Sequence, residues 1–213
     1  MRAEELSAFQ RSMHIIGLTG SIGMGKTAVA QLFRNAGIPV HDSDALIHRL
    51  YSGLAVPLIE TAFPGTTQDG SVNRGRLAAR VLVDPIELRK LESIVHPLAA
   101  EDRAAFLAGQ TRLAQKLVVL DIPLLFESGM VAIVNTIVVV SAPAQMQRLR
   151  VCNRPGMTTE KFERILAQQM PDAAKRRGAD FIIPTGGNLS ETRSRVLELI
   201  ARCAEIQDEG LDA

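Results

Sequence analysis

The sequence predicts an α/β protein with a mostly parallel five-stranded sheet. Five short runs are rich in β-branched and apolar residues, and most are apolar on both faces, which is typical of a covered parallel sheet. Segments with helical periodicity separate these runs, as in folds with right-handed crossovers. The 213 residues suffice for one core with a sizeable insertion. The predicted strands are residues 14–19, 38–42, 116–121, 135–141 and 180–184.

A glycine-rich loop follows the first predicted strand. Four glycines fall within residues 17–25, and a helical pattern begins near Lys26 and stops at Gly37. One face of this helix carries apolar residues at i, i+3, i+4 and i+7, namely Val29, Leu32, Phe33 and Ala36. The glycines therefore lie between a strand and a helix.

The eight residues G-S-I-G-M-G-K-T match the phosphate-loop pattern G-x-x-x-x-G-K-[S/T]. Glycines let the backbone wrap a polyphosphate with its N–H groups inward, and the helix N-terminus adds a positive dipole end. Lys26 would contact the β- and γ-phosphates, and the hydroxyl of Thr27 would bind Mg²⁺. This predicts a three-layer P-loop NTPase core. The expected nucleotide contacts are Gly20, Ser21, Ile22, Gly23, Met24, Gly25, Lys26, Thr27 and Ala28.

Two acids, Asp42 and Asp44, end the second predicted strand. Ligands of open parallel sheets bind outside the carboxyl ends of the strands, so an acid here suits a general base or a water-mediated metal contact. The alternative is that Asp42 or Ser43 caps the next helix. We favour Asp44 as the functional acid.

More than seventy residues without a predicted strand separate the second and third strands. They read as a helical insertion at the sheet edge, interrupted by the turn cluster P-G-T-T-Q-D-G at 64–70. Its predicted helices are residues 45–50, 55–62, 74–82 and 85 to about 107. His96 is either structural or catalytic, and Arg74 is either a solvated surface residue or a ligand for a phosphate group.

The third strand ends in L-V-V-L-D, the pattern of a Walker B acid, so Asp121 is either that acid or a strand-ending acid in a turn. The residues that follow, Pro123, Leu124, Leu125, Phe126 and Glu127, either line a substrate pocket or pack in the core.

An arginine-rich stretch, 147–177, follows the fourth strand. Phe162, Ile165, Leu166 and Gln169 share a helix face in it, with Thr158 as the N-cap. The stretch is either a solvated helix pair or a mobile lid whose arginines close over phosphates. We favour the lid.

Composition excludes several classes of protein. The net charge of +1 gives no broad field for nucleic acid or membrane surfaces, and no apolar run approaches the roughly 18–20 residues of a membrane span. Cys152 and Cys203 are too far apart in sequence for a metal motif, and a reduced cytosolic pair is favoured over a disulfide. Residues 1–12 lack the apolar core of a signal peptide and are expected to form a flexible extension.

Together these motifs resemble the dephospho-CoA kinase family over roughly residues 13–204. The phosphate loop is generic, whereas the joint presence of H-P and P-L-L-F-E is specific. The matching elements, in chain order, are G-L-T-G-S-I-G-M-G-K-T at 17–27, D-S-D at 42–44, D-G-x-x-x-R at 69–74, H-P at 96–97, D-I-P-L-L-F-E at 121–127, R-x-x-x-R-P-G-M-T at 150–158, Gln169 and Thr185-Gly186.

The resemblance implies transfer of the ATP γ-phosphate to the ribose 3′-hydroxyl of dephospho-CoA, with Mg²⁺ accompanying ATP. It implies that Asp44 is the base and that Lys26 and Arg150 act on the phosphates. Arg154 and Gly186 would contact ATP. Acceptor contacts would come from Thr19, Asp44, Arg74, His96, Pro123, Leu124, Leu125 and Glu127. Two positions depart from the family: Thr27 stands where many members have Ser, and Pro184-Thr185 where many have Asp-Asn, which loosens any claim about adenine contacts there.

The predicted domains are a nucleotide-binding core of residues 13–44, 115–146 and 178–206, a CoA-binding insertion of residues 45–114, and the lid. We expect a cytoplasmic enzyme whose partners are ATP and dephospho-CoA, with no nucleic-acid, membrane or obligate protein partner. Two rival functions remain at this point: another small-molecule kinase, and a regulatory nucleotide-binding switch. The switch lacks support, because no N-K-x-D-like guanine-reading motif is present.

Overall fold

The structure, a computed structural model, describes residues 9–10 and 12–211, except for the side chains of residues 206–211. Within this range the chain forms two units, one of residues 42–108 and one of the remaining residues before and after it. The predicted extension, residues 1–12, lies mostly outside the described residues. Its Gln10 side chain donates a hydrogen bond to the Ala132 carbonyl in the second unit.

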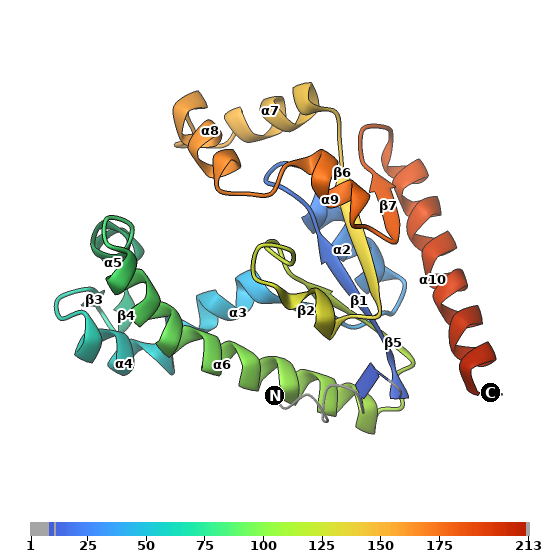
Figure 1. The fold of residues 1–213 in the computed structure, drawn as a ribbon, viewed down its shortest axis with the longest axis horizontal. Coiled ribbons are helices and arrows are strands. Elements are labelled where there is room, and N and C mark those ends of the chain that lie inside the picture. Colours follow the sequence, from blue (N-terminus) through green and yellow to red (C-terminus); the bar gives the residue numbers. More distant parts are fainter. Residues whose placement is uncertain (1–8, 11, 212–213) are drawn as a thin grey trace. The chain divides into compact units, whose positions relative to one another are not determined.

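The larger unit contains the predicted sheet, with strand order β2-β5-β1-β6-β7 (Figure 1). The strands are β1 (His14–Thr19), β2 (Val40–Asp42), β5 (Leu117–Asp121), β6 (Thr136–Ser141) and β7 (Phe181–Pro184). Central β1 is buried along its whole length and pairs in parallel with β5 and β6. The α/β class and the five-stranded sheet predicted from sequence are confirmed.

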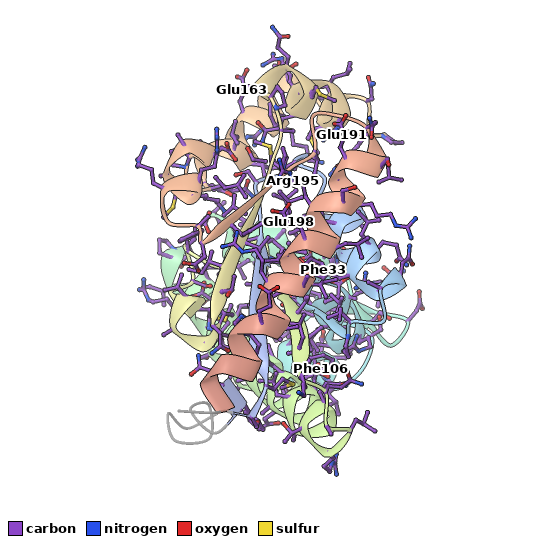
Figure 2. The ribbon with its side chains drawn as sticks, turned by 90° about the vertical axis from the view of Figure 1, so that its right-hand side faces the viewer. Phe33, Phe106, Glu163, Glu191, Arg195 and Glu198 are labelled. Carbon is purple, nitrogen blue, oxygen red and sulfur yellow. The ribbon has the colours of Figure 1, made fainter. Side chains whose placement is uncertain are left out.

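Two helices of this unit, α2 (Lys26–Asn35) and α10 (Leu189–Leu211), pack on one face of the sheet. Phe33 from α2 and Val196 from α10 are buried against Ile16 and Val140 of the sheet. Figure 2 shows α10 along this face, with Glu191, Arg195 and Glu198 spaced along it and Phe33 beside it. Gly37, with φ 80°, ends the α2 segment as predicted.

The arginine-rich segment forms three helices in the same unit: α7 (Ala144–Cys152), α8 (Thr159–Ala167) and α9 (Asp172–Arg177). A short 3-10 helix, η1 (Met130–Ile133), precedes β6. Thr158 caps α8 by accepting a hydrogen bond from the Lys161 N–H, which confirms the predicted N-cap. Figure 1 shows α7 and α8 at one end of the unit, joined to the sheet through β6.

The smaller unit is mostly helical, as predicted, and has its own apolar core around Phe63 and Ile59. Its helices are α3 (Ser43–Leu50), α4 (Ala55–Ala62), α5 (Arg74–Val81) and the first part of α6 (Pro85–Arg112). The prediction that this stretch lacks strands was wrong, because β3 (Thr67–Gln68) and β4 (Ser71–Val72) form a hairpin. Both residues of its Asp69-Gly70 turn have positive φ, the geometry of a type I′ turn.

Two further features bear on the composition analysis. Within residues 9–10 and 12–211, no helix is both long enough and apolar enough to cross a membrane. Cys152 and Cys203 are both free thiols, so the reduced pair was the correct alternative.

Candidate active site

The phosphate loop follows β1 at the carboxyl edge of the sheet, where two of its glycines cannot be replaced without a clash. A Cβ on Gly20 would lie 2.7 Å from the Val140 carbonyl oxygen. Gly23 has φ 79°, and a Cβ there would collide with Val151 of α7. The loop therefore passes so close to β6 and α7 that its path depends on glycine.

Two glutamines from the arginine-rich segment hold the tip of the loop. The Gln147 Nε2 donates to the Ile22 carbonyl at 2.8 Å, and the Ile22 N–H donates to Gln169 Oε1 at 3.0 Å. Gln147 is buried. Both polar groups of one loop residue are thus bonded to side chains that lie more than a hundred residues away in sequence.

The Lys26 ammonium forms an ion pair with Asp121 at 2.5 Å. Asp121 is buried at the end of β5, whereas the Lys26 side chain is 14% exposed. Asp121 does end a strand and precede a turn, but its carboxylate is not solvated: it holds the loop lysine at the carboxyl edge of the sheet. Thr27 and Ala28 are exposed in the first turn of α2. The Ser21 hydroxyl is buried without a hydrogen-bond partner.

The P-L-L-F-E loop is fastened to β1 and contains both buried and exposed side chains. Thr19 Oγ1 donates to the Pro123 carbonyl at 3.0 Å. Leu125 is fully buried close to Gly17, so core packing describes this residue. Leu124 is 43% exposed and could contact a ligand.

Glu127, at the end of the same loop, forms an ion pair with Lys175 of α9 at 2.9 Å. The Lys175 side chain is completely buried, and its ammonium also lies 3.4 Å from the Pro123 carbonyl oxygen. Burial alone would raise the pKa of Glu127, but hydrogen bonds from Lys175 and from the Met170 N–H outweigh it and hold the pKa below its usual value. The pair connects the loop to the arginine-rich segment.

Arg150 of α7 is half-buried and binds Thr185, the residue after β7. Its Nη2 donates to the Thr185 carbonyl at 2.6 Å and its Nη1 to Thr185 Oγ1 at 3.2 Å. Arg154 is exposed. Gly186 packs so closely on Pro143 that a Cβ would lie 2.7 Å from that ring. The structure thus brings Arg150 and Gly186 together at the end of β7.

Three predicted residues, Asp44, Arg74 and His96, lie in the smaller unit, and all three are exposed. Asp42 caps α3 by accepting from the Ala45 N–H, so the capping alternative holds for Asp42. Asp44 occupies the first turn of α3, and His96 lies within α6, next to Pro97.

Arg74 is held by two neighbours in the smaller unit. Its Nη2 lies 3.3 Å from His48 Nδ1, and its guanidinium lies 5.5 Å from the centre of the Tyr51 ring. The ring stacks with the cation and so restricts its position. The guanidinium remains exposed and could accept a phosphate group.

Sequence reasoning missed the structural roles of Lys175 and Gln147. Lys175 was counted only as one charge among several, and nothing in the run D-A-A-K-R-R distinguishes it from its arginine neighbours. Gln147 lies at the start of the arginine-rich stretch, and its sequence surroundings carry no signal for a bond to the phosphate loop.

Comparisons with known proteins agree on one family. A family model described as dephospho-CoA kinase matches residues 14–191. A dephospho-CoA kinase from Mesorhizobium japonicum is 56% identical over 188 residues, which is 88% of this chain and 95% of that protein. A dephospho-CoA kinase from Rhizobium etli is 53% identical over 87% of this chain and 92% of its own length.

Solved structures share the fold. The crystal structure of TT1252 from Thermus thermophilus superposes with a TM-score of 0.80 at 36% identity, covering 89% of this chain and 97% of that one. A dephospho-CoA kinase from Campylobacter jejuni gives a TM-score of 0.61 at 19% identity, over 90% and 98% of the two chains. At that identity the second match concerns the fold alone.

Proposed function

The chain belongs to the dephospho-CoA kinase family, and we propose how its residues carry out transfer of the ATP γ-phosphate to the ribose 3′-hydroxyl of dephospho-CoA. The products are coenzyme A and ADP. The observation that carries the proposal is the glycine-dependent phosphate loop with its Lys26–Asp121 pair, in a chain matched to the family model over residues 14–191.

ATP binds with its phosphates on the loop from Gly20 to Ala28. Lys26 is held by Asp121 within the loop's own unit, and its ammonium neutralises charge on the β- and γ-phosphates during transfer. Mg²⁺ accompanies ATP. Most of the ligands of Mg²⁺ in such sites are water molecules and phosphate oxygens, so the protein needs to supply only one or two. The exposed Thr27 hydroxyl fits such a hard ion.

Asp44 accepts the proton of the acceptor 3′-hydroxyl or orients that hydroxyl. Its carboxylate is exposed, while neighbouring Asp42 is used as the helix cap. Arg74, preoriented by Tyr51, supplies a fork for a phosphate of the acceptor, and His96 contributes a second polar contact from the same unit. The exposed Leu124 and the partly exposed Glu127 of the loop 123–127 face the acceptor, and the fully buried Thr19 supports that loop through the Pro123 carbonyl.

Residues 147–177 act as a lid. Arg150 stabilises charge on the transferring phosphoryl group, and exposed Arg154 and the backbone at Gly186 contact ATP. Removing water from the closed site strengthens these contacts. We place the reaction in the cytoplasm, with ATP and dephospho-CoA as the partners and no nucleic-acid, membrane or obligate protein partner.

A coupled ADP-release assay with Mg-ATP tests the function directly. Dephospho-CoA is compared with adenosine, AMP, shikimate and no acceptor, and the product is identified by mass. Turnover that requires dephospho-CoA and yields coenzyme A supports the proposal. ADP release that ignores the acceptor, or prefers another one, contradicts it and favours a different small-molecule kinase or a nucleotide switch.

Two variants test the assigned roles. Lys26→Ala should remove most activity, because the phosphate charge loses its main counter-charge. Asp44→Ala should lower kcat on the order of 10²–10⁴-fold while ATP still binds. Glu87→Ala is a control for Asp44→Ala, since Glu87 is likewise an acid in the first turn of a helix, α6, although it is partly buried. Equal losses in both variants would mean that Asp44 acts only on its helix.

A further inference from the structure

Thr185 is a buried polar residue at the carboxyl edge of the sheet. It directly follows β7, and its N–H donates to the Ser141 carbonyl at 2.9 Å, which extends the β6–β7 ladder by one residue. Its backbone position is therefore set by the sheet. The residue is 6% exposed, so its hydroxyl needs partners within the protein.

The hydroxyl of Thr185 is bonded to the phosphate loop. Thr185 Oγ1 donates to the Met24 carbonyl at 2.6 Å. A Cβ on neighbouring Gly25, where φ is 91°, would lie only 3.0 Å from the same oxygen. A threonine hydroxyl has one proton, and the short distance assigns that proton to Met24. The loop immediately before Lys26 thus rests on Thr185.

The acceptor atoms of Thr185, its hydroxyl oxygen and its carbonyl oxygen, both bind one arginine, Arg150. Thr185 Oγ1 accepts from Arg150 Nη1 at 3.2 Å, and the Thr185 carbonyl accepts from Nη2 at 2.6 Å. The guanidinium fork is therefore fixed in two directions. Since the same oxygen bonds both Met24 and Arg150, a single atom connects the phosphate loop to the lid arginine.

We propose that Thr185 is a positioning residue for phosphoryl transfer: its hydroxyl holds Arg150 in register with the phosphate loop. The proposal rests on the role given to Arg150 under the proposed function. A hydroxyl suits this role, because it can donate to Met24 while it accepts from Arg150.

Thr185→Val replaces the hydroxyl with a methyl group of similar size and so removes the Oγ1 bonds to Met24 and Arg150, together with a longer contact of 3.5 Å to the Ser141 carbonyl. We expect kcat to fall on the order of 10–100-fold, because a small misplacement of a charged catalytic group has effects of this size. Thr185→Ser keeps the hydroxyl and should restore kcat to within about threefold of wild type. A Thr185→Val enzyme with wild-type kcat, or a Thr185→Ser enzyme as impaired as Thr185→Val, would overturn the proposal.

Thr192→Val is a matched control. Thr192 of α10 is 4% exposed, and its hydroxyl lies 3.2 Å from the Asn188 carbonyl oxygen, just before the helix, and 3.4 Å from the Pro184 carbonyl oxygen. It is as buried as Thr185, but among the described residues its hydroxyl bonds neither the phosphate loop nor an arginine. Its kcat should stay near wild type. Equal kcat losses in Thr185→Val and Thr192→Val would indicate a general effect of removing a buried hydroxyl and would overturn the proposal.

A double-mutant cycle with Arg150→Met separates positioning from structure. If Thr185 acts through Arg150, Thr185→Val should lower kcat little further in the Arg150→Met background. If Thr185 is merely structural, Thr185→Val lowers kcat by the same factor in the Arg150→Met background as in wild type, and the proposal fails. Should Thr185→Val not fold, as judged by circular dichroism, Thr185→Ala enters the same cycle, because it also lacks the hydroxyl but has no branched methyl group.

The wild-type assay with dephospho-CoA keeps the two proposals apart. Absence of coenzyme A formation by wild type refutes the proposed function. Normal wild-type turnover together with an additive cycle refutes only the role of Thr185.

Discussion

The Glu127–Lys175 pair predicts an unequal response to removal of its two partners. Lys175 is completely buried, whereas the Glu127 side chain is 19% exposed. Glu127→Gln keeps the shape of the side chain but leaves a buried ammonium with only neutral oxygen partners. Lys175→Met keeps the length of the side chain and leaves a carboxylate that still reaches water and still accepts from the Met170 N–H.

The burial of each partner determines the expected magnitudes. Breaking a buried ion pair by removing one partner costs about 3–5 kcal/mol, and partial exposure of Glu127 brings Glu127→Gln to about 2–3 kcal/mol. Lys175→Met should cost about 1 kcal/mol, because the carboxylate it leaves behind is partly solvated. The double variant leaves no buried charge at the site of this pair and should be more stable than Glu127→Gln alone.

Urea unfolding followed by circular dichroism measures these differences, with thermal melts as a second readout. A chain of this size shifts by roughly 2–4 °C per kcal/mol, so Glu127→Gln should lower Tm by about 4–12 °C. Arg195→Met serves as a control, because the Arg195–Glu198 pair has the same kind of charges at 3.0 Å but is exposed on α10 and should be worth under about 1 kcal/mol. The reasoning is refuted if Lys175→Met destabilises more than Glu127→Gln, or if the two losses add in the double variant.

Three further predictions concern pH, thiol chemistry and the phosphate loop. The pKa of Glu127 is lowered in the folded protein, so the stabilisation by this carboxylate is present above the unfolded pKa of about 4.3 and is lost as pH falls through the folded pKa. The difference in unfolding free energy between wild type and Glu127→Gln should therefore be constant near pH 7 and shrink below about pH 4. A difference that persists below about pH 4 in acid unfolding curves would contradict this. Burial raises the pKa of Cys203 to about 11, so about one thiol in a thousand is ionised at pH 8. Iodoacetamide should therefore label half-exposed Cys152 in the native protein and Cys203 only after unfolding, which mass spectrometry of the peptides would measure. Gly23→Ala and Gly37→Ala both place alanine at positive φ, but of the two glycines only Gly23 has neighbouring atoms where the added Cβ would lie. Gly37→Ala should therefore cost about 1–2 kcal/mol of stability and leave ATP affinity unchanged, whereas Gly23→Ala should also weaken ATP binding measured by calorimetry. Equal ATP affinity in both variants would argue against contact between this part of the loop and ATP.

Local patterns predicted the fold well because most of its elements are determined locally. The strands are apolar on both faces, and α8 has its cap at Thr158, so each was visible in a short window. The hairpin of β3 and β4 was missed, because strands of two residues are too short to show any alternation. Helix α6 runs to Arg112 instead of about Leu107, because residues 108–112, A-G-Q-T-R, include a glycine and have no large apolar side chain to mark a helix face.

In the candidate site, too, the contiguous features were predictable from sequence and the contacts between distant residues were not. The phosphate loop is a contiguous motif and could be predicted from its glycines. The bond from Thr185 to Met24 joins residues 161 positions apart, and the bond from Gln147 to Ile22 joins residues 125 apart. Such bonds depend on which strand ends meet at the sheet edge, and this depends on the strand order, which composition and periodicity do not specify.

The two acids that end β2 and β5 show how a local cue separates similar motifs. Both Asp42 and Asp121 follow apolar residues at a strand's carboxyl end. A helix begins at Ser43, directly after Asp42, and its unpaired N–H groups engage the Asp42 carboxylate. Asp121 is followed by a loop that contains Pro123, not by a helix start, and its carboxylate binds a side chain, that of Lys26.

The same cue bears on the proposed base. The capping bond of α3 is made by Asp42, so the helix does not require a second acid for that purpose. Asp44, in the first turn, is exposed, so its carboxylate is accessible to a ligand. A carboxylate that is not engaged in helix capping suits proton acceptance from a hydroxyl that becomes more acidic as phosphoryl transfer proceeds. The position of a helix start, readable from sequence, therefore separates the capping acid, Asp42, from Asp44, the acid that we propose for the chemistry.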